Sequence, residues 1–413
     1  MTESSPTSAL TFALTLPPLS LYIHVPWCVR KCPYCDFNSH QRDGDLPEDA
    51  YIDALLADLR ADAHYARDRR LQSIFIGGGT PSLLSARAYD RLLTECDRLV
   101  PFAGDVEITL EANPGTAEQE KFRGFRAAGI NRLSIGVQSF DAAQLRQLGR
   151  IHDGGEALRA ADFARNAGFD NFNLDLMFGL PGQTTAQALA DLQAAMGCTP
   201  AHLSWYQLTI EPNTEFFRRP PVLPHDDAIA EMQDAGIALL AGHGYARYEI
   251  SAYARPGRQA RHNLNYWTFG DYLGIGAGAH GKLTLTGANA VVRTRKTRMP
   301  EHYLAAAGVR SEDTSPASGS AIVTTASTPA RFTAETKPVP ADELPLEFMM
   351  NALRLSGGVT AASFPAHTGL PLATIATELD SLRRRGLLDA APDRIQPTER
   401  GLLYLNELLL AFM

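Results

Sequence analysis

Three cysteines lie within eight residues near the amino terminus, and their spacing carries the clearest chemical signal in the sequence. Cys28, Cys32 and Cys35 form the pattern C-x3-C-x2-C. Structural zinc sites generally need four ligands, usually as two separated pairs. Three close thiolates without a second pair nearby favour a [4Fe–4S] cluster in which one iron has no protein ligand. Arg30 and Lys31 are expected to favour the thiolate forms. The alternative is a set of structural or zinc-binding cysteines.

The cysteine count also bears on the cellular compartment. The chain has 413 residues and five cysteines, and Cys96 and Cys198 stand far from the other three. An odd, clustered set in a chain of this length is not typical of a disulfide framework. We therefore expect a metal-binding protein of the reducing cytoplasm, with Cys96 and Cys198 in structural positions.

Charge and hydropathy exclude several other classes of protein. The chain is 45% hydrophobic and 20% charged, with a formal net charge of −8. This balance is typical of a globular protein, and the acidic excess argues against general nucleic-acid binding. No apolar run approaches the roughly 18 residues of a membrane span. Leu10–Leu21 is mildly apolar, but the first basic residue is Arg30, which is the wrong order for a secretory signal. We expect no nucleic-acid partner and no membrane span.

The elements that position these cysteines alternate between residues 21 and 280. The expected strands are Leu21–Val25, Ser73–Gly77, Asp105–Ala112, Arg132–Gln138, Asn171–Phe178 and His202–Ile210. The expected helices are Asp49–Arg69, Ala86–Leu99, Ala117–Ala128, Gly154–Ala167 and Thr185–Met196. Such alternation favours an α/β fold with a parallel sheet and right-handed crossovers. Six strand–helix units fit either an open partial barrel or a doubly wound sheet. Both place their chemistry after the carboxyl ends of the strands.

The composition changes after the alternating region. Residues 311–340 are rich in Ser, Thr, Ala and Pro, and we expect a flexible insertion there. The helical patterns that follow are Leu346–Leu355, Leu372–Arg385 and Thr398–Phe412. This order is winged-helix-like, and such domains often bind DNA. Because Arg383–Arg385 is the only basic run in this part of the sequence, we expect a role in packing or in covering the substrate instead. The expected division is residues 1–20, 21–280 (core), 281–342 (connection) and 343–413 (C-terminal domain).

Several motifs, taken together, resemble those of radical SAM proteins. They match the family that contains oxygen-independent coproporphyrinogen III oxidase and its relatives, the heme chaperones. The matching segments are Tyr22–Cys28, Cys32–Asn38, Gly77–Ser82, Glu111–Pro114, Ser134–Ser139, Leu148–His152 and Asp175–Gly182. The resemblance is close over about residues 20–280 and looser in the C-terminal domain. It implies a partial (β/α)6 radical SAM barrel with a C-terminal helical, winged-helix-like domain. It also implies that S-adenosylmethionine (SAM) binds the open iron through its amino and carboxylate groups.

The resemblance also implies a set of cofactor-binding residues. Those that would line the SAM pocket, or a second SAM-like pocket beside it, are Tyr22, Gly78, Gly79, Thr80, Glu111, Gln138, Arg150 and Asp175. The glycine loop would grip the amino group of SAM, and Glu111 would accept hydrogen bonds from its ribose. Without the family context, a tight turn and strand-end polar groups would explain the same residues. We assign no catalytic residue from the sequence.

Two features separate the branches of this family. The oxidases usually carry a fourth cysteine two positions beyond the third, where this chain has Phe37. The segment His262-Asn-Leu-Asn-Tyr266-Trp267 resembles a heme chaperone signature, with an imidazole for heme iron and two aromatic rings for a porphyrin. A loop histidine beside two core aromatics is the alternative. We expect a heme chaperone that binds the cluster, SAM and heme, and delivers heme to an acceptor such as a membrane respiratory enzyme. The alternative is the oxidase, a radical SAM enzyme of porphyrin biosynthesis.

Overall fold

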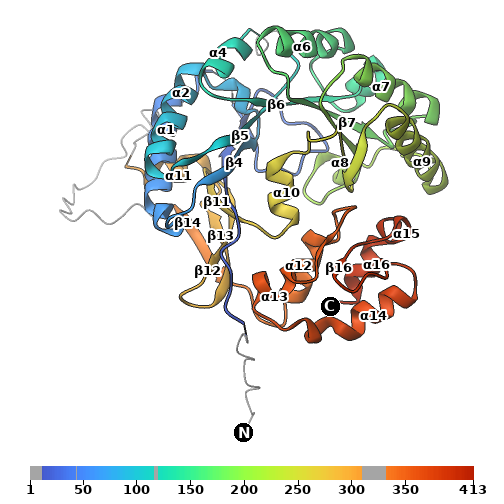
Figure 1. Cartoon of the computed structure of the whole chain (residues 1–413). Helices are drawn as coiled ribbons and strands as arrows, with labels where there is room; N and C mark the ends of the chain where they lie inside the picture. The colour runs from blue at the N-terminus through green and yellow to red at the C-terminus, as the bar shows by residue number, and fades with distance from the viewer. Residues whose placement is uncertain (1–11, 43, 116–119, 309–331) are drawn as a thin grey trace.

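A curved sheet with helices along its outer side dominates the computed structural model (Figure 1), which describes residues 12–42, 44–115, 120–308 and 332–413. Within the described residues this sheet has twelve strands, in the order β14-β13-β12-β11-β1-β4-β5-β6-β7-β8-β10-β9. None of the described helices has the length and apolar content that crossing a membrane would require.

Six parallel strands form the centre of the sheet. They are β1 (Leu19–Val25), β4 (Leu71–Gly78), β5 (Phe102–Ala112), β6 (Arg132–Gln138), β7 (Phe172–Phe178) and β8 (His202–Gln207). The helices between them are α1 (Glu48–Asp62), α2 (Ala86–Leu99), α4 (Phe122–Ala127), α5 (Ala142–Gln147), α6 (Gly154–Asn166) and α7 (Thr185–Gly197). Each strand joins the sheet next to its predecessor, whereas a doubly wound sheet reverses its strand order. The predicted partial (β/α)6 barrel is therefore confirmed.

The sheet extends beyond these six strands at both edges, which the sequence patterns did not predict. Next to β1 lie β11 (Asp271–Ile275), β12 (His280–Leu285), β13 (Ala290–Lys296) and β14 (Thr333–Pro338). Next to β8 lie β10 (Ala252–Ala254) and β9 (Ala246–Glu249). The prediction of a flexible insertion over 311–340 was wrong for residues 333–338, because this segment pairs with β13 along its length. Residues 311–331 lie outside the described residues.

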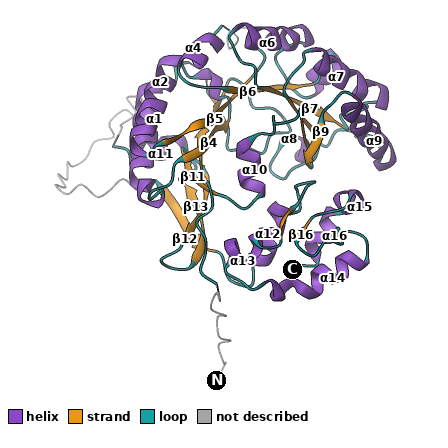
Figure 2. Cartoon of the chain, viewed as in Figure 1, coloured by secondary structure: helices purple, strands orange, loops and turns teal. Residues whose placement is uncertain are grey.

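The remaining elements of the barrel are short, apart from one long helix. They are β2 (Trp27–Cys28), β3 (His40–Gln41), α8 (Glu215–Arg218), α9 (Asp226–Gly242), α10 (Arg261–Trp267) and α11 (Pro300–Ala306), with short 3-10 turns at Ala63–Tyr65 and Pro81–Leu83. Helix α10 differs from the outer helices because it lies on the concave side of the sheet, between the barrel and the C-terminal domain (Figure 2). It packs on β1, β4 and β11 from one side and on α12 from the other.

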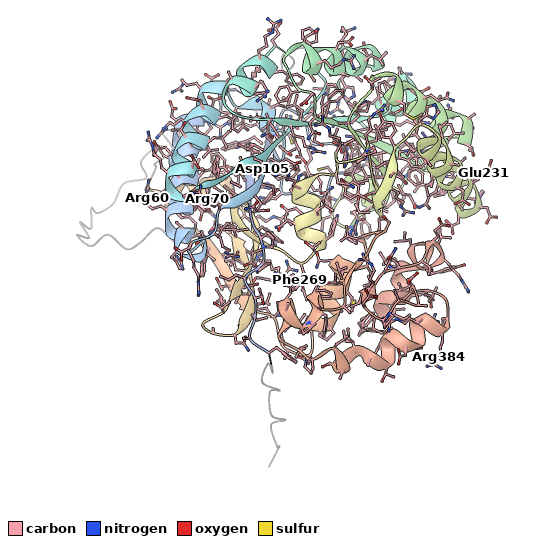
Figure 3. The ribbon with its side chains drawn as sticks, in the orientation of Figure 1. Arg60, Arg70, Asp105, Glu231, Phe269 and Arg384 are labelled. Carbon is pink, nitrogen blue, oxygen red and sulfur yellow. The ribbon has the colours of Figure 1, made fainter. Side chains whose placement is uncertain are left out.

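The C-terminal domain is helical, as predicted, and has its own hydrophobic core. Its elements are α12 (Leu344–Ala352), β15 (Val359–Thr360), α13 (Ser363–Thr368), a 3-10 turn (Leu372–Ile375), α14 (Ala376–Arg384), β16 (Arg394–Ile395), α15 (Glu399–Leu403) and α16 (Leu405–Leu410). The predicted last helix is divided at Tyr404, and α13 was not predicted. Phe269, labelled in Figure 3, lies between the two parts and its ring centroid is 5.4 Å from that of Phe348.

Candidate functional site

The three clustered cysteines line one cavity at the carboxyl ends of the parallel strands. β1 leads directly into their loop, which a short parallel pairing of β2 with β3 closes. Within the loop, the amide of Cys35 donates a hydrogen bond to the carbonyl of Cys32 at 3.1 Å. Cys28, Cys32 and Cys35 then border a cavity of about 430 Å³. We call this space the cysteine cavity.

The arrangement of the cysteines fits a cluster better than a single ion. Among the described residues, no group of three His, Cys, Asp or Glu side chains is placed to hold one metal ion. A zinc ion requires its thiolates to converge to about 2.3 Å from one point. The corners of a cubane are spread more widely, so cysteines that share a cavity without converging suit it.

The environment of the thiols differs from the sequence-based expectation. Burial raises the pKa of the Cys28 and Cys35 thiols, and Lys31 offsets this only slightly at Cys35. The expectation that Arg30 and Lys31 favour thiolates was therefore wrong for Cys28, because burial raises its pKa and the groups that lower it are Thr80 and Ser39 rather than these two cations. The guanidinium that does reach a cysteine belongs to Arg150, whose Nη1 lies 3.7 Å from Cys32 Sγ. Bound iron would compensate buried thiolates directly.

The glycine loop after β4 is held against the cysteine loop by its backbone. The amide of Gly79 donates to the carbonyl of Val25 at 2.7 Å, and the amide of Thr80 donates to that of Trp27 at 2.7 Å. A Cβ atom at Gly79 would overlap the Trp27 carbonyl. Gly78 has a φ of +118°, a conformation that glycine adopts readily. The structure therefore brings Gly78, Gly79 and Thr80 to the cysteine cavity, as the resemblance implied.

Two half-buried carboxyl groups, those of Glu111 and Asp175, line the cysteine cavity. Glu111 Oε2 accepts a hydrogen bond from the Gly78 amide at 3.0 Å. Asp175 accepts from Ser134 Oγ at 2.9 Å and from Asn173 Nδ2 at 2.8 Å. Burial, followed by the charge of Asp175, raises the pKa of Glu111 to about 8, and burial also raises the pKa of Asp175. A ligand with hydroxyl donors or a positive charge would stabilise the ionised forms of both groups.

A pH-dependent stability follows from the raised pKa of Glu111. A folded-state pKa of about 8, above the ordinary value, means that this carboxyl is most stabilising when protonated. Stability is therefore lost as the pH rises from about 5 to 8. We expect cofactor-free wild type to lose roughly 1–3 kcal/mol more than Glu111→Gln over this range, at about 1.4 kcal/mol for each pKa unit. Urea unfolding of both proteins at each end of the range measures the difference.

The matched control for this measurement is Glu231→Gln, which changes an exposed carboxylate on α9 (Figure 3). Its stability is expected to follow that of the wild type at both pH values. An equal loss in Glu111→Gln and the wild type would contradict the assignment of the pH dependence to Glu111.

Arg150 and Gln138 complete the predicted set in this cavity. Arg150 Nη2 donates to Asn113 Oδ1 at 2.7 Å and to the Gly136 carbonyl at 2.6 Å. Gln138 ends β6 with a φ of +68°, which is unusual for a residue with a side chain. Asn113, which also donates to Thr80 Oγ1 at 3.2 Å, was missed by the sequence-based assignment. Its place directly after β5, within the Glu111–Pro114 motif, is the signal that would have identified it.

Tyr22 lies in a second cavity that adjoins the first. This cavity, which we call the arginine cavity, measures about 450 Å³ and shares Asp36, Phe37, Gly78 and Glu111 with the cysteine cavity. Tyr22 is the one position of β1 that is not fully buried. Its hydroxyl hydrogen-bonds His24 Nδ1 at 2.7 Å, and burial raises its pKa well above the usual range.

The structure does not bring the His262–Trp267 motif to either cavity. His262 is buried on α10, with Nδ1 3.3 Å from Glu107 Oε1 and its ring stacked 4.3 Å from that of Phe75. Tyr266 packs against Tyr272 at 4.8 Å, and Arg354 lies over the ring of Trp267 at 4.4 Å. His262 is therefore buried, whereas Tyr266 and Trp267 are half-buried, and all three lie on a helix rather than in a loop. A heme contact by these three residues stays a prediction.

Comparisons with known proteins agree with this arrangement. The radical SAM superfamily model matches residues 22–195, and the HemN C-terminal domain model matches residues 339–404. Heme chaperone HemW of Escherichia coli is 50% identical over 96% of this chain and 99% of its own length. The Bacillus subtilis heme chaperone HemW is 34% identical over 95% of this chain and 99% of its own length.

Among solved structures, the fold is similar to that of coproporphyrinogen III oxidase (HemN) from Escherichia coli. The TM-score is 0.77 with 23% identity, covering 96% of this chain and 90% of that one. At this identity the likeness shows the shared fold, whereas the full-length matches at higher identity show the family. The chain belongs to the heme chaperone HemW family of the radical SAM superfamily.

Proposed function

We propose that this protein is a heme chaperone, which binds heme and transfers it to an acceptor protein. The observation that carries the proposal is 50% identity over nearly the full chain to a curated heme chaperone. The geometry supports it with two adjoining cavities, one bordered by the three cysteines and the other large enough for part of a flat ligand. An acceptor such as a respiratory enzyme, and a cytoplasmic location, belong to the same proposal.

The proposed cofactors are a [4Fe–4S] cluster and SAM, both in the cysteine cavity. Cys28, Cys32 and Cys35 would hold the cluster, which when bound supplies a redox-active iron with a position open to SAM. Gly78–Thr80 would then orient the amino group of SAM, and Glu111 would accept from its ribose hydroxyls. The remaining residues proposed for this cavity are Gln138, Arg150 and Asp175. Hydrogen bonds to neighbouring residues hold the polar groups of Arg150 and Asp175 ready at the cavity wall, which reduces the ordering that binding requires.

The oxidase alternative lacks comparable support. The family places a fourth cysteine in the oxidases at the position of Phe37, and Phe37 is 56% exposed at the border of the two cavities. The resemblance to coproporphyrinogen III oxidase at 23% identity extends to the fold. We therefore expect no oxidative decarboxylation of coproporphyrinogen III.

The test combines two assays on one anaerobically reconstituted protein. Heme titration followed by absorbance is expected to show saturable binding, and a labelled heme acceptor fraction is expected to gain heme from the loaded protein. Incubation with coproporphyrinogen III, SAM and a reductant is expected to give no vinyl product. Vinyl formation without heme binding would replace the chaperone assignment with the oxidase one.

A further inference from the structure

The arginine cavity has the composition of a porphyrin site, although no predicted heme residue lies in it. Its lining combines aromatic and basic side chains with the carboxyl groups of Asp36 and Glu111. The residues that give it this character are Tyr22, Phe37, Phe75, His280, Arg295 and Arg298. An iron porphyrin has an apolar face, a metal that accepts imidazole, and two carboxylates on one edge, so the aromatic, imidazole and guanidinium groups of the lining each have a counterpart in this ligand.

Phe37 and Phe75 supply the apolar surface. Phe37 is 56% exposed, which leaves a large aromatic side chain in solvent at the border of both cavities. Phe75 is held from behind, since the ring of His262 stacks on it at 4.3 Å. A flat apolar ligand placed between them would remove this surface from water, at about 25 cal/mol for each Å² covered. The position of Phe75 also connects the His262–Trp267 motif to the cavity through one layer of packing.

His280 supplies an imidazole that forms no hydrogen bond with any described residue. It begins β12, is exposed to the cavity, and forms no hydrogen bond with a described residue. The neighbouring His24 is different, because one ring nitrogen bonds the Tyr22 hydroxyl at 2.7 Å and the other bonds the Asn38 carbonyl at 2.9 Å. Neutral imidazole with an available nitrogen is the usual protein ligand of heme iron.

Two arginines border the cavity beside His280. Arg295 is the direct cross-strand partner of His280 in the β12–β13 pairing, so their side chains leave the sheet next to each other. Its guanidinium is half exposed and 3.3 Å from Glu335 Oε2. Arg298 also lines the cavity, and its Nε donates to Asn38 Oδ1 at 3.0 Å. Guanidinium groups bind carboxylates by paired hydrogen bonds, and two of them match the two propionates of heme.

We propose that the arginine cavity is the heme site of this protein, with His280 as an axial ligand of the iron and Arg295 and Arg298 as partners of the propionates. The inference rests on the proposed chaperone function and deepens it by placing the cargo. Because this cavity shares Gly78 and Glu111 with the cysteine cavity, heme would lie directly beside the cluster and SAM. Helix α10 would act from behind Phe75 as a positioning element.

The test titrates ferric heme into full-length, cluster-reconstituted protein. His280→Ala is expected to weaken heme binding by about tenfold or more and to shift the Soret band, since an iron ligand is lost. The double variant Arg295→Gln with Arg298→Gln is expected to weaken binding by a similar factor without the shift, because the iron ligand remains. Iron and sulfide content and SAM binding should equal those of the wild type in both. The matched control is His243→Ala, which removes an exposed histidine at the end of α9.

The outcomes separate this inference from the function on which it rests. If wild type fails to bind heme, the chaperone proposal fails. If wild type binds heme and His280→Ala shows the same affinity and spectrum, the placement is overturned while the chaperone proposal stands. A spectral change in His262→Ala instead would put the ligand on α10. Loss of a second SAM equivalent from the arginine variants, with heme binding intact, would assign the cavity to SAM and overturn the inference.

Discussion

Replacing Cys32 by serine is expected to abolish the normal [4Fe–4S] cluster. Iron in such clusters is held by thiolates, and a serine hydroxyl deprotonates too reluctantly to replace one. Cys32 lies in the same cavity as Cys28 and Cys35, and no fourth cysteine is found among the described residues that line it. We expect anaerobic reconstitution of Cys32→Ser to yield less than about a tenth of the wild-type iron and sulfide, with loss of the visible absorbance of the cluster.

The control for this experiment is Cys198→Ala, at the end of α7 and outside both cavities. It should retain full iron loading, since removal of a structural cysteine leaves the cluster ligands intact. Full loading of Cys32→Ser would contradict the ligand assignment. Intermediate iron loading with an altered absorbance spectrum would contradict the expected loss of the cluster, because it would mean that serine ligates iron here.

Gly79→Ala is expected to weaken SAM binding strongly while leaving the three cysteines unchanged. Its added methyl group would overlap the Trp27 carbonyl, which also accepts the amide of Thr80 at 2.7 Å. Backbone cannot yield as a flexible side chain does, so the glycine loop must move away from the cysteine loop. Overpacking of this kind costs about 1–3 kcal/mol of stability. If the free energy of SAM binding falls by a comparable amount, the affinity for SAM falls by about tenfold or more. Equilibrium dialysis measures this affinity.

Gly104→Ala provides the matched control for the same chemical change. Gly104 is an exposed residue near the start of β5, and an added Cβ there would meet no atom within 4 Å. Its SAM affinity and urea midpoint should remain those of the wild type. Wild-type SAM affinity in Gly79→Ala would contradict the role of this loop, whereas a loss of affinity in both variants would point to a general effect of substitution.

The predictable part of the fold came from patterns that are local in sequence. The six central strands were placed within a few residues of their observed bounds, because each is a short apolar run followed by a helix of regular spacing. The edge strands β9 to β14 were missed. They carry charged and polar residues, as Lys282 and Arg293 illustrate. In addition, β10, β11 and β14 pair with strands that are distant in the chain. Local pattern does not report such pairing.

The same division holds for the candidate site. The sequence alone determined which chemistry the chain can support, since the spacing of Cys28, Cys32 and Cys35 and the polar residues after successive strands are local properties. Parallel strands bring their carboxyl ends to one edge, which favours a shared site there. It was the resemblance to radical SAM proteins that implied which polar residues line a SAM pocket or a second pocket beside it. The structure places Glu111 and Asp175 in the same cavity, and their contact with SAM stays a prediction.

Only the tertiary structure decided which residues line the arginine cavity and which lie outside it. His280 and Arg295 meet through the β12–β13 pairing, and they join Phe37 from a loop more than two hundred positions earlier in the chain. His262 carried the stronger sequence motif, yet it is buried against Glu107 on an inner helix. The physical reason is that cavity walls arise from contacts between distant strands, whose free energy depends on burial and pairing partners that spacing along one segment does not record.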